Sequence, residues 1–99
     1  MLKDIFDVFE GDLKDPAYAA QLLKMSLEEE TLDVFLVNLR DIVRANGGAI
    51  SLAKAAGLGR ESLYKTLSPG HSPEFKTICA ILKALGLSVD FAPIAKRAA

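Results

Sequence analysis

Apolar residues recur at three- and four-residue steps along much of the chain, the spacing that places side chains on one face of a helix. The clearest run follows Thr31, whose side chain is suited to cap a helix start. The run ends at Asn46-Gly47-Gly48, where glycine permits the left-handed turn that closes a helix. The pattern predicts an amphipathic helix, with an apolar face formed by Leu32, Phe35, Leu36, Leu39, Ile42 and Val43.

An earlier helix is predicted to begin at Asp15-Pro16, since aspartate can cap free amide groups and proline fits the first helical position. We expect this helix to run to about Leu27. The acidic run Glu28-Glu29-Glu30 is unfavourable at the C-terminal end of a helix and favourable before a new one. We therefore interpret it as a charge cluster at the start of the next helix. The apolar residues of the earlier helix are Tyr18, Ala19, Leu22, Leu23 and Met25.

Two short helices are predicted in the middle of the chain, over about residues 50–56 and 60–67. Gly57 lies between them and separates the two helices. The Ser-Pro-Gly sequence at residues 68–70 is typical of a turn.

A fifth helix is predicted to start at Ser72-Pro73-Glu74, which offers a cap, a first-position proline and an acid in the first turn. Gly86 ends it, and residues 87–91 then alternate between apolar and polar, which suits a short strand or an extended arm. Together these elements predict an all-α, five-helix fold. The buried side of the fifth helix is predicted to be Phe75, Ile78, Ile81, Leu82 and Leu85.

The ends of the chain are predicted to lie outside the helical domain, which covers residues 15–91. Residues 1–14 form an N-terminal extension and residues 92–99 a C-terminal tail. The apolar residues from Ile5 to Phe9 suit a helix or a strand equally, because periodicity does not separate the two over so short a stretch. They could serve as core, dimer interface or contact with a partner protein.

Composition excludes several classes of protein. Apolar residues make up 51% of the chain, which is a globular composition, and no apolar run approaches the roughly 20 residues that span a bilayer. The start lacks a signal-peptide core and there is one cysteine, Cys79, so we expect a cytoplasmic protein without an internal disulfide. Cys79 is interpreted as a buried small hydrophobe and His71 as an exposed turn residue. No catalytic constellation, metal site or cofactor site is predicted, and the protein is not expected to be an enzyme.

Charge is distributed unevenly along the chain. Residues 1–39 carry three basic and nine acidic groups, a net charge of −6. Residues 40–76 carry six basic and three acidic groups, and residues 77–99 carry three basic groups and one acidic group. The overall charge of −1 is therefore the sum of an acidic first part and a basic remainder. This asymmetry favours contact with nucleic acid by the basic part.

The stretch from residue 51 to residue 67 has the spacing of a helix-turn-helix. Ala53 is a small residue where two helices can touch, and Gly57, four positions later, can accept positive φ in the turn. Leu63, six positions after the glycine, can bury itself against the first helix. The other core positions would be filled by Leu52, Leu58 and Leu67.

This run resembles the Xre or Cro/C1-type helix-turn-helix domain, which has the five-helix lambda-repressor-like fold. The resemblance continues through residues 73–78 and 84–91, and one departure is Gly59, where many relatives carry Ser or Thr. A narrower resemblance, to the small addiction-module antidotes or HigA-like antitoxins, rests on residues 15–19, 38–42 and 58–65. The family implies a homodimer that binds double-stranded DNA and represses its own operon. The narrower match implies neutralisation of a toxin encoded beside it.

The motif places its second helix in the major groove, with the N-terminal residues of that helix against base edges. Carried over by position, the DNA-contacting residues are Arg60, Glu61, Ser62 and Lys65, with Tyr64 on the flank. Lys54 and either Ser68 or His71 would contact phosphates. Arg60 or Lys65 could donate to guanine, or both could instead be solvated residues of an exposed helix. Glu61 could accept from cytosine, or instead pair with a neighbouring base or repel phosphate. Tyr64 could contact a base or sugar, or instead pack against the protein.

The sequence thus predicts a DNA-binding regulator that is the antitoxin of a toxin–antitoxin pair. The alternative is a protein-interaction module that binds a partner without touching DNA, because the acidic first third would repel phosphate and could bind a basic toxin.

Overall fold

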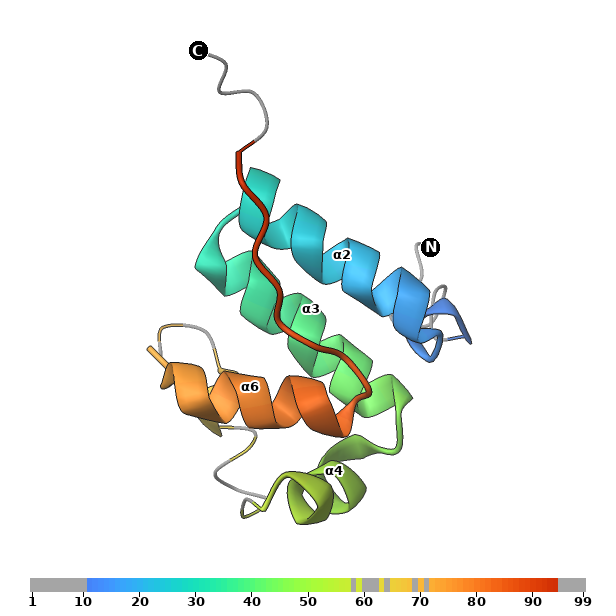
Figure 1. The fold of residues 1–99 in the computed structure, drawn as a ribbon. Helices are drawn as coiled ribbons and strands as arrows, with labels where there is room; N and C mark the ends of the chain where they lie inside the picture. Colours follow the sequence, from blue (N-terminus) through green and yellow to red (C-terminus); the bar gives the residue numbers. More distant parts are fainter. Residues whose placement is uncertain are drawn as a thin grey trace, which may run out of the picture.

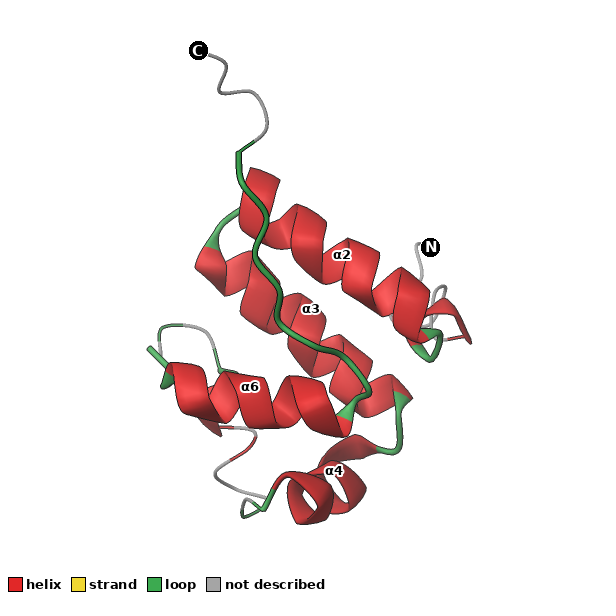
Figure 2. Ribbon diagram, in the orientation of Figure 1, coloured by secondary structure: helices red, strands yellow, loops and turns green. Residues whose placement is uncertain are grey.

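The computed structural model describes residues 11–57, 59, 63, 65–68, 70 and 72–94, apart from the side chains of Ala49, Ile50 and Ala55. Four helices are defined in this part of the chain, namely α2 (Pro16–Glu29), α3 (Leu32–Ala45), α4 (Gly48–Ala56) and α6 (Phe75–Ala84). No strand occurs among the described residues, and the all-α prediction is confirmed (Figure 2). None of the helices described is long and apolar enough to cross a bilayer.

The helices are arranged around α3 (Figure 1). α2 and α3 lie side by side and run in opposite directions, while α4 packs against both α3 and α6. α2 and α4 therefore lie at opposite ends of the molecule, joined by α3.

Both predicted caps at the starts of α2 and α3 are confirmed. The N–H of Ala17 donates to the carboxylate of Asp15 at 3.0 Å, with Pro16 as the first helical residue. The N–H of Val34 donates to the hydroxyl of Thr31 at 3.2 Å. Each bond satisfies an amide that has no partner within its helix.

The predicted place of the glutamate run is wrong. α2 continues to Glu29, and Glu30 follows as its C-cap, donating its N–H to the carbonyl of Ser26 at 3.0 Å. Glutamate is a good helix former, so the helix extends through the run despite the unfavourable dipole. The charges therefore lie at the C-terminal end of α2.

One hydrophobic cluster joins the described elements. Leu13, from the short helical stretch that precedes α2, belongs to it, and Asn46 holds that stretch by donating to the Leu13 carbonyl at 3.1 Å. Leu32 is the exception on the predicted apolar face of α3, because it opens the helix and is 52% exposed. The side chains at the centre, each at most 1% exposed, are Leu36, Leu39, Ile42, Val43, Leu63, Leu67 and Ile81.

α6 begins later than predicted. Glu74 is its N-cap, with extended backbone and no side-chain cap bond, so Ser72 does not cap the helix. The carbonyl of Glu74 accepts the first helical bonds, from Thr77 and Ile78. Phe75, predicted to be buried, is 64% exposed because it stands at the first helical position, outside the packed face. Ile78, Ile81 and Leu82 are buried, and Leu85 and Cys79 are half-buried.

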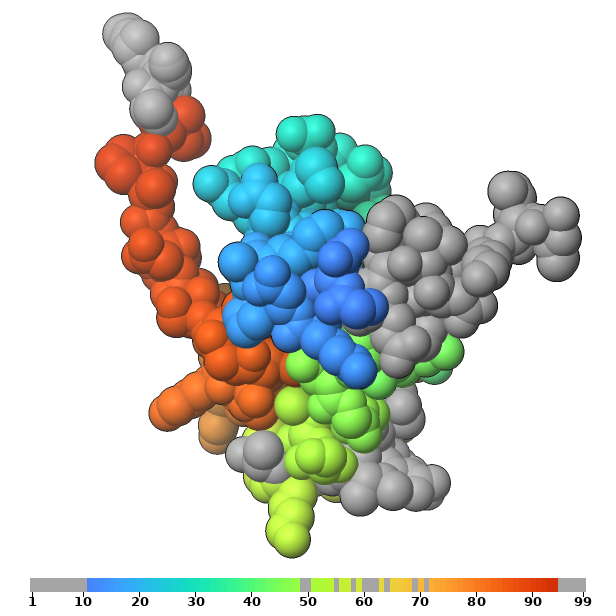
Figure 3. All heavy atoms as spheres, turned by 90° about the vertical axis from the view of Figure 1, so that its right-hand side faces the viewer, coloured from blue at the N-terminus to red at the C-terminus, as the bar shows by residue number. Residues whose placement is uncertain are grey.

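Gly86 ends α6 as predicted, with φ of 83°. Its N–H bonds to the Lys83 carbonyl at 3.0 Å, and the N–H of Leu87 bonds to the Leu82 carbonyl at 2.8 Å, the pair that defines a Schellman motif. Residues 87–94 then form an extended arm. The strand alternative for residues 87–91 is wrong, because no described strand lies beside the arm to pair with it. Figure 3 shows the far end of the arm standing away from the helices.

Candidate nucleic-acid interface

The candidate DNA-binding unit begins with α4. Two glycines with positive φ precede and open this helix, Gly47 at 100° and Gly48 at 76°, and they turn the chain sharply out of α3. Gly57 ends the helix with φ of 74° and donates its N–H to the carbonyls of Ala53 and Lys54. α4 is therefore a helix of 9 residues bounded by left-handed turns at both ends.

A second helical segment follows the turn. The N–H of Leu63 donates to the carbonyl of Gly59 at 3.0 Å, and the N–H of Leu67 donates to the carbonyl of Leu63 at 3.2 Å. Both are helical spacings, and Leu63, Lys65 and Thr66 have helical geometry. Gly59 thus supplies a backbone acceptor at the start of this segment, where it has no side chain to act as a cap.

The buried residues of the unit hold the two segments together. Ala53 and Leu63 belong to the same hydrophobic cluster and are 3% and 0% exposed. Leu52 and Leu67 are also in that cluster. A small residue on α4, a left-handed glycine after it and a buried leucine beyond the turn therefore occur in the order that a helix-turn-helix requires.

Three of the proposed DNA-contacting residues are described. Lys54 on α4 and Lys65 on the second segment are exposed, and Ser68 after that segment is half-buried. The others lie outside the described residues, namely Arg60, Glu61, Ser62 and Tyr64, as do His71 and the motif leucine Leu58.

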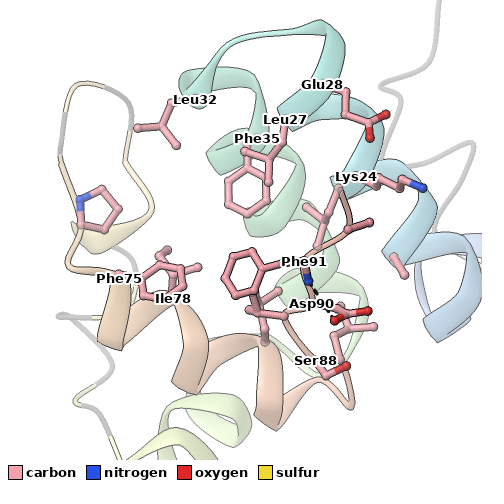
Figure 4. Close-up of a pocket in the computed structure, with 17 residues that line it drawn as sticks. Lys24, Leu27, Glu28, Leu32, Phe35, Phe75, Ile78, Ser88, Asp90 and Phe91 are labelled. Atoms are coloured by element: carbon pink, nitrogen blue, oxygen red, sulfur yellow. Dashed lines mark hydrogen bonds between the residues drawn. The ribbon is translucent and has the colours of Figure 1, made fainter. Parts of the chain in front are cut away.

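A second site, which the sequence did not indicate, lies between α2, α3, α6 and the arm, and α4 does not line it. A groove of about 700 Å³ is bounded by the end of α2, the start of α3, the start of α6 and the arm (Figure 4). Its lining includes Leu27, Leu32, Phe75 and Phe91, all exposed by more than half. We call these residues and the space between them the apolar groove. The signal that could have located it is an apolar residue at the first position of both α3 and α6.

Carboxylates stand at the apolar groove and beside it. Glu28 and Asp90 line it, and the carboxylate of Asp90 accepts the N–H of Phe91 at 2.8 Å (Figure 4). Glu29, Glu30 and Asp33 follow Glu28 closely in the chain and are exposed. Lys24 is the one basic residue among the described groove-lining residues.

The chain was compared with known proteins. A family model described as "Probable addiction module antidote protein" matches residues 4–93. An uncharacterized protein of Haemophilus influenzae is 40% identical over 86 residues, which cover 87% of this chain and 86% of that protein. No solved structure matches the chain. The family match spans nearly the whole chain, so this protein belongs to the family of probable addiction module antidotes.

Proposed function

We propose that this antidote binds and neutralises its cognate toxin and, as a homodimer, represses its own operon by binding DNA through the helix-turn-helix. Membership of the antidote family implies a toxin as partner. The DNA half rests on one observation, the arrangement of Ala53, Gly57 and Leu63 in two helical segments with Lys54 and Lys65 exposed on them.

In the proposed complex the second helical segment enters the major groove. Arg60, Glu61 and Ser62 then face base edges, and Lys65 contacts bases or phosphates with Tyr64 on the flank. Lys54 and Ser68 contact phosphates and fix the register without reading sequence. In a two-fold dimer, two such segments read half-sites about 34 Å apart, one turn of DNA.

The charge distribution supports a division between the two ends. Acidic residues gather at the end of α2 and the start of α3, where they would repel phosphate, whereas α4 lies at the opposite end. DNA and toxin can therefore bind this antidote without competing for the same surface.

The DNA half is tested with a fluorescent duplex taken from the region upstream of the gene, by measuring anisotropy over a range of salt concentrations. We expect wild-type affinity to fall with salt, because phosphate contacts release counterions. The double variant Lys54→Ala/Lys65→Ala removes two such contacts from each copy, four from the dimer, and should reduce the magnitude of the slope of log K against log salt by about 4. Lys14→Ala/Lys24→Ala makes the same change in charge outside the two helical segments, just before and on α2, and serves as control.

Two results would refute DNA binding by this unit. One is the absence of salt-dependent binding by the wild-type protein to its upstream DNA. The other is equal affinity for the two double variants. Neutralisation of the toxin without any DNA binding would favour the protein-interaction module instead.

A further inference from the structure

We propose that the apolar groove is the surface that docks the toxin, and that it receives a basic segment bearing apolar side chains. This inference rests on the proposed antidote function and says which surface of the fold binds the toxin.

The first argument is the exposed apolar surface. Leu27, Leu32, Phe75 and Phe91 are 59%, 52%, 64% and 83% exposed, and they come from α2, α3, α6 and the arm. Exposed apolar area costs about 25 cal/mol per Å² relative to its burial, and large contiguous patches of this kind mark interaction sites. Figure 4 shows the apolar side chains of Leu27, Phe35, Phe75 and Phe91 gathered around one space, whereas Lys24 and Glu28 extend away from it.

The second argument is electrostatic and identifies the occupant. Glu28 and Glu29 lie in the last turn of α2, which has no basic residue, so they face the negative end of the helix dipole. Within the part of the chain that is described, no ion pair involves these residues, Glu30 or Asp33. A cationic segment in the apolar groove would neutralise Glu28 and Asp90, the two carboxylates that line it, and Glu29, Glu30 and Asp33 add negative charge along the same stretch of chain.

A second copy of this chain suits the groove poorly. A two-fold interface brings the same patch of each copy together, so the carboxylates of one copy would approach those of the other. Lys24 is the one basic side chain among the described lining residues and cannot compensate them. Charge complementarity therefore favours a basic partner over self-association.

The arm adds a third element to the docking surface. Its exposed side chains include Val89, Phe91 and Ile94. Among the described residues, no backbone–backbone hydrogen bond joins residues 88–92 to another element. Apart from the N–H of Phe91, which donates to the Asp90 carboxylate, the main chain of residues 88–92 is thus open to an incoming segment, as in complexes where an extended peptide pairs with an open edge.

The test uses as its probe the protein encoded by the reading frame adjacent to this gene. Its affinity for the full-length antidote is measured by calorimetry. Leu32→Ser/Phe91→Ser removes apolar contacts at two exposed positions and should weaken binding at least tenfold. Met25→Ser/Val37→Ser, at exposed positions that do not line the groove, should change it less than twofold.

A charge variant tests the choice of occupant. Glu28→Lys should also weaken binding at least tenfold at low salt and by less at high salt, because added ions screen the pair. Asp12→Lys makes the same change away from the groove and should have little effect. Thermal melting and binding to the upstream duplex verify that every variant is folded.

The possible outcomes separate the two proposals. If the wild-type antidote binds the probe and the groove variants bind it equally well, the docking inference is overturned and the antidote function stands. If the wild-type antidote neither binds nor neutralises the probe, the proposed function fails and the docking inference fails with it. Selective loss in the groove variants supports both.

Discussion

Ser26 illustrates how a single polar residue joins two helices. It is 2% exposed on α2, where its hydroxyl donates to the carbonyl of Leu22 at 2.8 Å and accepts the side-chain amide of Asn38 on α3 at 2.7 Å. It continues the buried stripe of Ala19 and Leu23 at helical spacing. That spacing predicts burial for position 26, but the partner comes from α3, 12 residues away, and a local pattern does not specify it.

Removing this bond should destabilise the protein. Ser26→Ala leaves the Asn38 amide without its acceptor, and we expect a loss of about 1 kcal/mol in the free energy of unfolding. Asn38→Ala should cost a similar amount. Urea denaturation of the two single variants and the double variant should give a coupling energy of about 0.5–1.5 kcal/mol, and strictly additive losses would contradict the bond.

A substitution at Gly57 tests whether the left-handed turn between the two helical segments is required. A Cβ at this position meets nothing within 4 Å, so the cost of Gly57→Ala arises from its φ of 74° alone. We expect a loss of about 1–2 kcal/mol in unfolding free energy. Gly11→Ala is the matched control, because Gly11 is helical and a Cβ there also meets nothing within 4 Å. Equal effects of the two substitutions would show that the left-handed turn is not required.

At the scale of the element, the starts and ends of helices divide into those that sequence predicts and those that it does not. The caps at Asp15 and Thr31 and the end at Gly86 follow from local chemistry, so the pattern finds them. Leu32 and Phe75 follow the apolar period equally well, yet they open their helices and face the apolar groove. Whether the first residue of a helix meets the core depends on tertiary packing, which a one-dimensional pattern does not contain.

We expect the glutamates at the C-terminal end of α2 to lower the stability of the free protein. Glu29→Lys replaces an unfavourable charge at the helix C-terminus with a favourable one, so we expect a gain of about 0.3–1 kcal/mol at low salt. Asp33→Lys, in the first turn of α3, should have the opposite sign because an acid is favourable there. Chemical denaturation at two salt concentrations measures both effects. A loss of stability in Glu29→Lys would contradict the view that this acid is unfavourably placed in the free protein.

At the scale of the whole molecule, the two proposed activities lie at opposite ends of α3. The charge count along the sequence anticipates this division, since the acidic residues precede the basic ones and the fold keeps α2 and α4 apart. The groove could not be anticipated in the same way, because its lining comes from four separate segments that meet through the packing of α6 and the return of the arm.

Growth of cells that express the adjacent reading frame tests the central claim most directly. Three forms of the antidote are co-expressed in turn, namely wild type, Lys54→Ala/Lys65→Ala and Leu32→Ser/Phe91→Ser. We predict that wild type and the lysine variant restore growth and that the groove variant, although folded, does not. Failure of folded wild-type protein to restore the growth of cells poisoned by that frame would contradict the account.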